Sequence, residues 1–334
     1  MADTYTQVKD ITVSITTSAV IGSVGLGYPL VIQGAAEKEV EYTECNDLTE
    51  VVKAGFTTDS EVYKACAAIF AQANKPKTVA VVATTGKTND WLIEFKEKEF
   101  RQIVPILGGE TDCDETDLVK AVSTMEDKML FLAFSTLEEM PTINSDRVVA
   151  VMYGKASYAN AAVVGASAGL TPGSFTYKNL ILTGVEPVEM NSATVDTIHE
   201  KGAICILKKA GDIVTSEGKT TSGEYIDVID SKDYIINNIV YKCQKLLNDS
   251  PKLSFDNVGI SQLENTVTSV LADAYNMGII ATNDDGTAAY STTFAPRAET
   301  SASDRASRTY NGGNFTFDLA GAIHYAHIKG QIVI

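Results

Sequence analysis

Two short stretches of the sequence carry residues that enzymes use to bind phosphate. Residues 22–27 read GSVGLG, and residues 84–87 read TTGK after an apolar run. A dinucleotide-binding fingerprint needs the order GxGxxG at the start of a helix, whereas here the order is GxxGxG and a Tyr-Pro pair follows. The TTGK stretch lacks the spacing of a P-loop. We therefore interpret the glycine-rich stretch as a linker and predict no nucleotide site.

The three histidines, His199, His324 and His327, are the next candidates for chemistry. A zinc site needs three or four ligands, and no cysteine pairs with these histidines in such a spacing. On a strand, His324 and His327 point to opposite faces unless a bulge lies between them. We predict that the histidines are structural and that the protein binds no metal and no cofactor.

The acidic residues give no better candidate for a catalytic centre. There are 43 of them, scattered along the chain, so any pair chosen by eye would carry no meaning. Asp227 stands just before a predicted helix, where capping or a turn hydrogen bond is the usual role. The sequence contains no nucleophile elbow and no HExxH motif. We therefore predict a protein that is not an enzyme.

Composition excludes several other classes of protein. The chain has 334 residues, of which 45% are hydrophobic, and its net charge is −16, whereas a nucleic-acid binder would usually be basic. No apolar run reaches the roughly 18 residues that a membrane span needs, and the first residues do not resemble a signal peptide. The five cysteines are far apart and form no CxxC pair, which indicates reduced, buried thiols of a cytoplasmic product: Cys45, Cys66, Cys113, Cys205 and Cys243.

Strand and helix patterns alternate between residues 31 and 170. Three continuous apolar runs are typical of strands covered on both faces of a mainly parallel sheet: TVAVVA (78–83), KMLFLAF (128–134) and RVVAVMY (147–153). Helical patterns fall between or after them, at residues 57–73, 90–100, 115–125 and 158–168. We expect Thr58 and Glu61 to form a capping box at the first of these helices.

The pattern changes near residue 171. Residues 203–230 read as strands joined by glycine turns, and two amphipathic helices follow at residues 231–248 and 260–278. Another strand is expected at residues 288–294. Residues 295–313 are small and polar, which indicates a flexible tether. In this tether Arg305 and Arg308 are either solvated or paired with acids of a neighbouring subunit.

Both ends of the chain carry a strand with one apolar face. Near the start the apolar residues are Ile11, Val13 and Ile15, and near the end they are Phe315, Phe317, Leu319, Ile323, Tyr325 and, after a change of parity, Ile328. These strands either pair within their own subunit or are donated to another copy. Two donated arms per chain would give a polymer, because contacts that do not close on themselves generate filaments.

Several stretches, taken together, resemble the tail sheath protein of contractile bacteriophages and of phage-like R-type bacteriocins. The resemblance covers residues 171–334 and the N-terminal arm. It is carried by TPGSFTYKNLILTGVEP (171–187), GKTTSGEYIDVIDSKDYI (218–235), LSFDNVGI (253–260), SASDRASR (301–308) and FTFDLAGAIHYAHIKGQIVI (315–334).

The resemblance implies a mixed subunit that combines an α/β and an α+β part. We expect an N-terminal arm and linker at 1–30, an outer α/β domain at 31–170, a conserved α+β inner core at 171–295, and a C-terminal linker and strand arm at 296–334. Each arm would add a strand to the sheet of a neighbouring subunit. The arms would thereby hold the helical polymer together while it contracts.

The resemblance also implies partners and a location. Hexameric rings of this subunit would stack as a helical sheath around an inner tail tube, between baseplate and tail terminator proteins. No nucleic acid and no membrane insertion are expected. The location would be the virion tail, assembled in the cytoplasm of the host bacterium, where contraction drives genome ejection. The alternatives are the sheath of a bacteriocin or other contractile injection system, and a soluble α/β nucleotide-binding enzyme.

Overall fold

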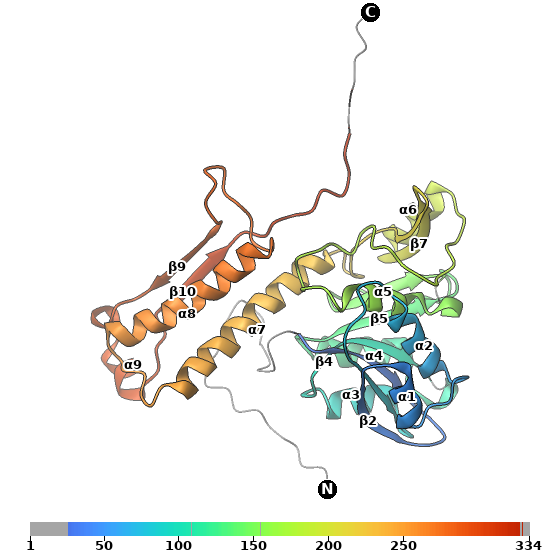
Figure 1. The fold of residues 1–334 in the computed structure, drawn as a ribbon, viewed down its shortest axis with the longest axis horizontal. Helices are drawn as coiled ribbons and strands as arrows, with labels where there is room; N and C mark the ends of the chain where they lie inside the picture. Colours follow the sequence, from blue (N-terminus) through green and yellow to red (C-terminus); the bar gives the residue numbers. More distant parts are fainter. Residues whose placement is uncertain (1–25, 108, 154, 328, 330–334) are drawn as a thin grey trace, which may run out of the picture.

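The protein consists of two bodies that one long helix connects (Figure 1). A computed structural model describes residues 26–107, 109–153, 155–327 and 329. The larger body is built on an eight-stranded sheet, and the smaller body combines helices with a two-stranded sheet. No helix among these residues is long and apolar enough to cross a membrane.

The large sheet has the strand order β2-β3-β1-β4-β5-β6-β7-β8. Its strands from β3 to β7 run parallel, and β2 and β8 pair antiparallel at the two edges. The bounds are Tyr28–Gln33 (β1), Val40–Cys45 (β2), Val79–Ala83 (β3), Phe100–Ile106 (β4), Met129–Phe134 (β5), Val148–Met152 (β6), Ala203–Lys209 (β7) and Asp212–Thr215 (β8).

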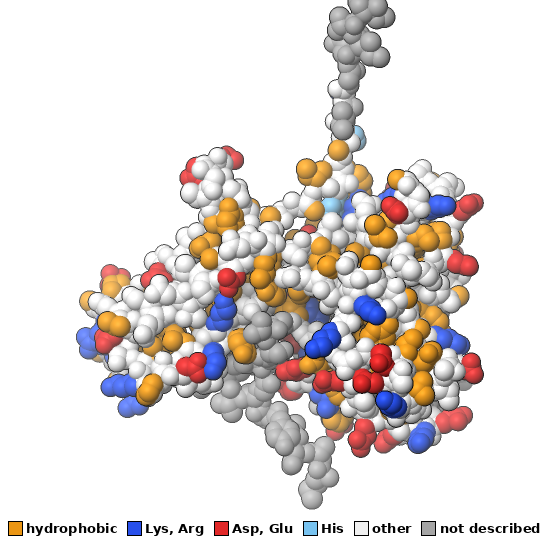
Figure 2. Space-filling view, in the orientation of Figure 1, with side chains coloured by type: hydrophobic (Ala, Val, Ile, Leu, Met, Phe, Trp, Pro, Cys, Tyr) orange, Lys and Arg blue, Asp and Glu red, His pale blue; other side chains and the backbone are white. Residues whose placement is uncertain are grey.

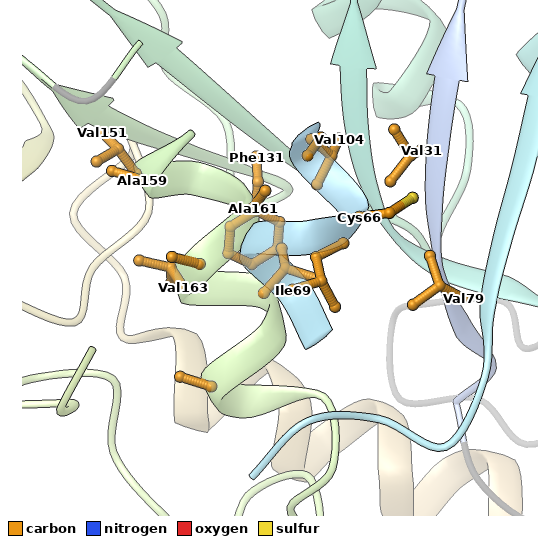
Figure 3. Close-up of a cluster of buried hydrophobic side chains, with 14 of the residues drawn as sticks. Val31, Cys66, Ile69, Val79, Val104, Phe131, Val151, Ala159, Ala161 and Val163 are labelled. Atoms are coloured by element: carbon orange, nitrogen blue, oxygen red, sulfur yellow. The ribbon is translucent and has the colours of Figure 1, made fainter. Parts of the chain in front are cut away.

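Helices cover both faces of this sheet, which explains why β3, β5 and β6 are continuous apolar runs. The core on one face includes residues of α1 (Leu48–Ala54), α2 (Glu61–Phe70) and α5 (Ala159–Ser167). The core on the other face includes residues of α3 (Thr88–Glu94), α4 (Glu115–Ser123) and α6 (Ser192–Glu200). Figure 3 shows the first core, with Ile69 of α2 and Ala161 of α5 close to Phe131 of β5.

The smaller body has its own core, between α7 (Ile226–Asp249), α8 (Asn257–Asn276) and an antiparallel hairpin of β9 (Tyr290–Phe294) and β10 (Gly313–Phe317). Ile235 and Ile239 of α7 and Leu271 of α8 are buried in it. The remaining helices are short: α9 (Ala302–Ser307), η1 (Gly109–Thr111), η2 (Lys155–Ser157) and η3 (Arg297–Glu299).

The predicted α/β rhythm is confirmed for its three apolar runs, which form β3, β5 and β6. The expected capping box is wrong, because the side chain of Ser60, and not that of Thr58, accepts the hydrogen bond from the Tyr63 amide at the start of α2. Two central strands were not predicted. These are β1, which begins in the supposed linker, and β4, which was assigned in part to a helix.

The large sheet continues past residue 170, where the sequence suggested that a second region begins. Ala203 of β7 pairs with Ala150 of β6, and β8 then pairs with β7. The intervening loop returns to the same sheet, since Ile181 bridges to Val214. The expected division of the chain into four parts therefore stays a prediction, and the sheet itself crosses two of its boundaries, at residues 30/31 within β1 and at residues 170/171.

Candidate functional site

A buried pair of side chains lies at the carboxyl end of the sheet, near the crevice where an α/β enzyme would bind a nucleotide. Such ligands bind beyond the carboxyl ends of parallel strands, where the strand order reverses, and here β1 lies between β3 and β4. The Asp112 carboxylate accepts hydrogen bonds there from the Thr88 amide and hydroxyl, both at 2.8 Å. Both side chains are buried. A carboxylate of the protein itself thus binds the first amide of α3, a type of position where a phosphate can otherwise bind.

Gly34, directly after β1, is packed against this pair. A methyl group placed on Gly34 would lie 2.2 Å from Thr88 Oγ1 and 2.4 Å from Asp112 Oδ2. We expect Gly34→Ala to lower the free energy of unfolding by about 1–3 kcal/mol, as overpacking of a filled core does. Gly86→Ala is the matched control, because its nearest neighbour would be Thr84 Oγ1 at 3.5 Å. Urea denaturation of both variants tests this, and equal stabilities would contradict the crowding at Gly34.

No group of three or more metal-binding side chains occurs among the described residues. All five cysteines are buried and unpaired, as the sequence predicted. Burial raises the pKa of Cys45 and of Cys243 to about 11, so their thiols stay protonated at neutral pH. His199 of α6 lies 2.9 Å from the Ser216 hydroxyl. His327 is exposed.

The hairpin of β9 and β10 is the part of the structure best suited to bind another chain. One face of it packs against α8, where Thr292 lies 3.2 Å from the Thr268 hydroxyl. The opposite face is uncharged and carries Ser291, Thr293 and Thr316, all exposed. Because this sheet has only two strands among the described residues, the outer edge of each strand is open to a further strand.

The first half of the C-terminal strand pairs within its own subunit. Phe315 pairs with Thr292 and Phe317 with Tyr290, and both rings pack on the core of the smaller body together with Leu319. In this structure the side chains of Phe315, Phe317 and Leu319 cover their own α8, and their role in contacts between subunits stays a prediction. The sequence could not distinguish the two pairings, because an apolar face fits either.

After Ala320, which still donates to the Ile279 carbonyl, the described chain leaves the smaller body and extends away from the hairpin (Figures 1 and 2). Ile323 is 89% exposed and Tyr325 is 68% exposed. Ile328 of the predicted C-terminal arm, and Ile11, Val13 and Ile15 of the predicted N-terminal arm, lie outside the described residues. The roles of these residues in contacts between subunits stay predictions.

The predicted tether is partly folded, because it contains η3 and α9. Ser301 caps α9, and Arg305 donates to the carbonyl and, at 3.2 Å, to the hydroxyl of Thr300. Arg308 follows the helix in a left-handed conformation, with φ of 58°. Within the described part of the chain neither arginine forms an ion pair, so pairing with a neighbour stays a prediction.

A cluster that the sequence did not reveal holds the C-terminal segment against the larger body. We call it the tail clamp, and it consists of His324 and Tyr325 together with Thr176, Lys178, Glu217 and Tyr225. At its centre Lys178 and Glu217 form a buried ion pair at 3.0 Å. Burial alone would raise the pKa of Glu217, but hydrogen bonds from the Lys178 ammonium, the Gly218 amide and the Tyr325 hydroxyl outweigh it and lower that pKa.

A second unpredicted cluster fastens the start of α7 to the large sheet. Arg101 of β4 donates to Asp230 at 2.5 Å and to Asp233 at 2.7 Å, and Arg147 also binds Asp233. The Tyr177 hydroxyl donates to the other oxygen of Asp230 at 3.0 Å. Arg101 is only 4% exposed. One sequence signal was available, since an arginine inside an otherwise apolar strand requires a buried acid.

Solved structures resemble this chain over almost its full length. A chain of the contracted helical sheath of the anti-feeding prophage superposes with a TM-score of 0.70 at 12% identity, covering 100% of this chain and 99% of that one. The contracted PVC sheath complex of an extracellular contractile injection system gives 0.72 at 10% identity, with 99% and 98% covered. A sheath tail protein from Listeria innocua gives 0.58 at 12% identity, with 90% and 97% covered.

The protein therefore has the fold of contractile sheath proteins. No protein-family model matches the sequence, and no curated protein sequence matches it. The resemblance read from the sequence and the similarity of the structures agree on the same class of protein. The mixed α and β architecture expected from that resemblance is also present.

Proposed function

We propose that this protein is the structural subunit of a contractile sheath, which polymerises helically around an inner tube and contracts to drive that tube through a target envelope. The observation that carries the proposal is the similarity to contracted sheaths along the whole chain, including the smaller body and the segment after it. The fold alone would be compatible with other roles. The open edges of the β9–β10 hairpin supply the second argument.

Strand exchange between subunits follows from that hairpin. The C-terminal segment after β10 would add to an open hairpin edge of one neighbour, and the N-terminal arm would add to that of another. Burying one apolar side chain of the arm in a neighbour would contribute about 1.5–3 kcal/mol, and each new ladder hydrogen bond about 0.5–1.5 kcal/mol. One arm binds weakly, whereas many arms in a cylinder hold through avidity.

The proposed partners follow from the same role. They are further copies of this chain in stacked hexameric rings, an inner tube protein, and baseplate and terminator proteins at the two ends. The similarity to the anti-feeding prophage and PVC structures favours the sheath of a contractile injection system as a second candidate beside a phage tail. Capsid and terminase genes next to this gene would favour the phage. The location of the protein would then be the virion tail.

An enzymatic role has little support. At the start of α3 the Asp112 carboxylate accepts hydrogen bonds from Thr88, so the amide there is already bound within the protein. A sheath subunit needs no catalytic centre, because the extended polymer itself stores the energy of contraction. We therefore propose a structural protein without enzymatic activity, in which the four parts 1–30, 31–170, 171–295 and 296–334 serve as arm, outer domain, inner core and arm.

Negative-stain electron microscopy of the purified protein tests the proposal most directly. We expect striated cylinders or stacked rings above a critical concentration, because each arm adds a contact that does not close within one pair of subunits. Light scattering over a dilution series measures that concentration. A protein that stays monomeric at every concentration, even when the inner tube protein is added, would overturn the proposal.

A further inference from the structure

The tail clamp joins the C-terminal segment to the larger body of the same chain. The His324 side chain is only 9% exposed, its Nε2 atom lies 2.9 Å from the Thr176 hydroxyl, and its ring meets Tyr225 edge to face at 4.9 Å. Tyr325 donates its hydroxyl to Glu217 at 3.0 Å. The Lys178 ammonium lies 3.5 Å from the centre of the same ring, in cation–π contact.

The charges around His324 come from three segments of the larger body. Lys178 lies in the loop before α6, Glu217 lies in the loop after β8, and Asp227 lies in the first turn of α7. His324 Nδ1 is 3.5 Å from a Glu217 oxygen and has no hydrogen-bond partner among the described residues. Burial raises the pKa of Asp227, and the neighbouring His324 opposes that rise. The imidazole of His324 thus lies near the carboxylates of Glu217 and Asp227 and the hydroxyl of Thr176.

The contact of His324 with Thr176 lies on the larger body, outside the core of the smaller body in which β10 ends. Ala320 still donates to the Ile279 carbonyl in the smaller body, whereas His324 already contacts the larger body. Between them Ile323 is almost fully exposed. The segment from Gly321 to Ile323 therefore bridges two fixed points, and Tyr325 is the last described residue with a hydrogen bond to its own subunit.

We propose that the tail clamp fixes the point and the direction at which the C-terminal arm leaves its own subunit, so that the residues after Tyr325 form the donated part. The consequence for assembly rests on the proposed function. The clamp itself does not, because it is a contact within one chain. An arm whose base is already ordered loses less conformational entropy when it binds a neighbour.

Limited chymotrypsin digestion of the dilute protein tests the clamp without any polymer. Cleavage after residue 325 releases residues 326–334, which mass spectrometry detects, and it requires the clamp to open locally. Thr176→Val removes the hydroxyl that faces His324, and Tyr325→Phe removes only the hydroxyl that reaches Glu217. We expect Thr176→Val to raise the cleavage rate about fivefold, the equivalent of one neutral hydrogen bond. Tyr325→Phe should raise it at least as much, because its hydroxyl donates to the Glu217 carboxylate. Rates are normalised to those of the isolated peptides of residues 315–334.

Thr316→Val is the matched control, because its hydroxyl contacts Ser291 on the exposed face of the hairpin, outside the clamp. Its cleavage rate after Tyr325 should equal that of the wild type. Unchanged rates in both clamp variants, with unchanged melting temperatures, would overturn the proposal. Light scattering supplies a second readout, in which both clamp variants should raise the critical concentration for assembly about fivefold. A lower critical concentration would contradict the positioning role.

The two proposals fail in different ways. If the clamp variants are cleaved faster but the wild type never assembles, the result supports the tail clamp and contradicts the sheath function. If the wild type assembles and the clamp variants behave like it in both cleavage and light scattering, the result supports the sheath function and contradicts the tail clamp.

Discussion

A chain that ends at Ala320 is expected to stay folded and to form no cylinders. The truncation keeps β10, Leu319 and the hydrogen bond from Ala320 to Ile279, so the core of the smaller body remains complete. It removes His324 and Tyr325 of the tail clamp together with the following residues that we propose are donated, and each subunit then lacks one of its two arms. Circular dichroism measures the fold and electron microscopy the assembly. Normal cylinders from the truncated, folded chain would show that the arm is not needed.

Phe317→Asp serves as the contrasting variant. Because the Phe317 ring packs on its own core, the charge should destabilise the hairpin itself and lower the melting temperature. A loss of assembly in this variant therefore reports damage to the subunit. Thr316→Asp, on the exposed face, should leave the melting temperature close to that of the wild type.

Asp230→Ala is expected to lower the free energy of unfolding by about 3–5 kcal/mol, because it leaves the buried Arg101 without one of its two carboxylates. The Tyr177 hydroxyl loses its acceptor in the same substitution. Urea denaturation monitored by the fluorescence of Trp91, in the larger body, measures the change. A loss below about 1 kcal/mol would mean that water or Asp233 compensates for the missing carboxylate.

Asp249→Ala is the control for that experiment. It breaks the ion pair of Lys245 and Asp249 at the end of the same helix, where both side chains are more than half exposed. No measurable change in stability is expected, because exposed ion pairs of this kind contribute little. The comparison separates the effect of burial from that of charge alone.

The sequence predicts the parallel part of the sheet well, because strands covered on both faces must be apolar throughout. β3, β5 and β6 meet that condition. β4 does not, since it contains Arg101 and Gln102, whose partners lie on α7 and α5 and cannot be read from local pattern. The sequence pattern did not predict β1, because this strand follows a glycine-rich stretch and contains Pro29.

The candidate assembly region is predictable only in part. A final strand with one apolar face is evident from Phe315 and Phe317, and it exists. The identity of its partner strand depends on the distance between chain segments, which the sequence does not contain. For the same reason the tail clamp was not predicted, since His324 and its partner Thr176 are 148 positions apart.

The length and continuity of α7 have a mechanical consequence. It has 24 residues, so it extends for about 36 Å. Ile226 and Ile229 at its start lie in the core under the large sheet, and Ile239 and Cys243 lie in the core under the hairpin. A force on the hairpin is therefore transmitted to the sheet through α7. Ion pairs of Asp230 and Asp233 fasten the start of this helix to the sheet. A sharp bend of α7 between the two bodies would require hydrogen bonds of that helix to break, so we expect the two bodies to move together under load.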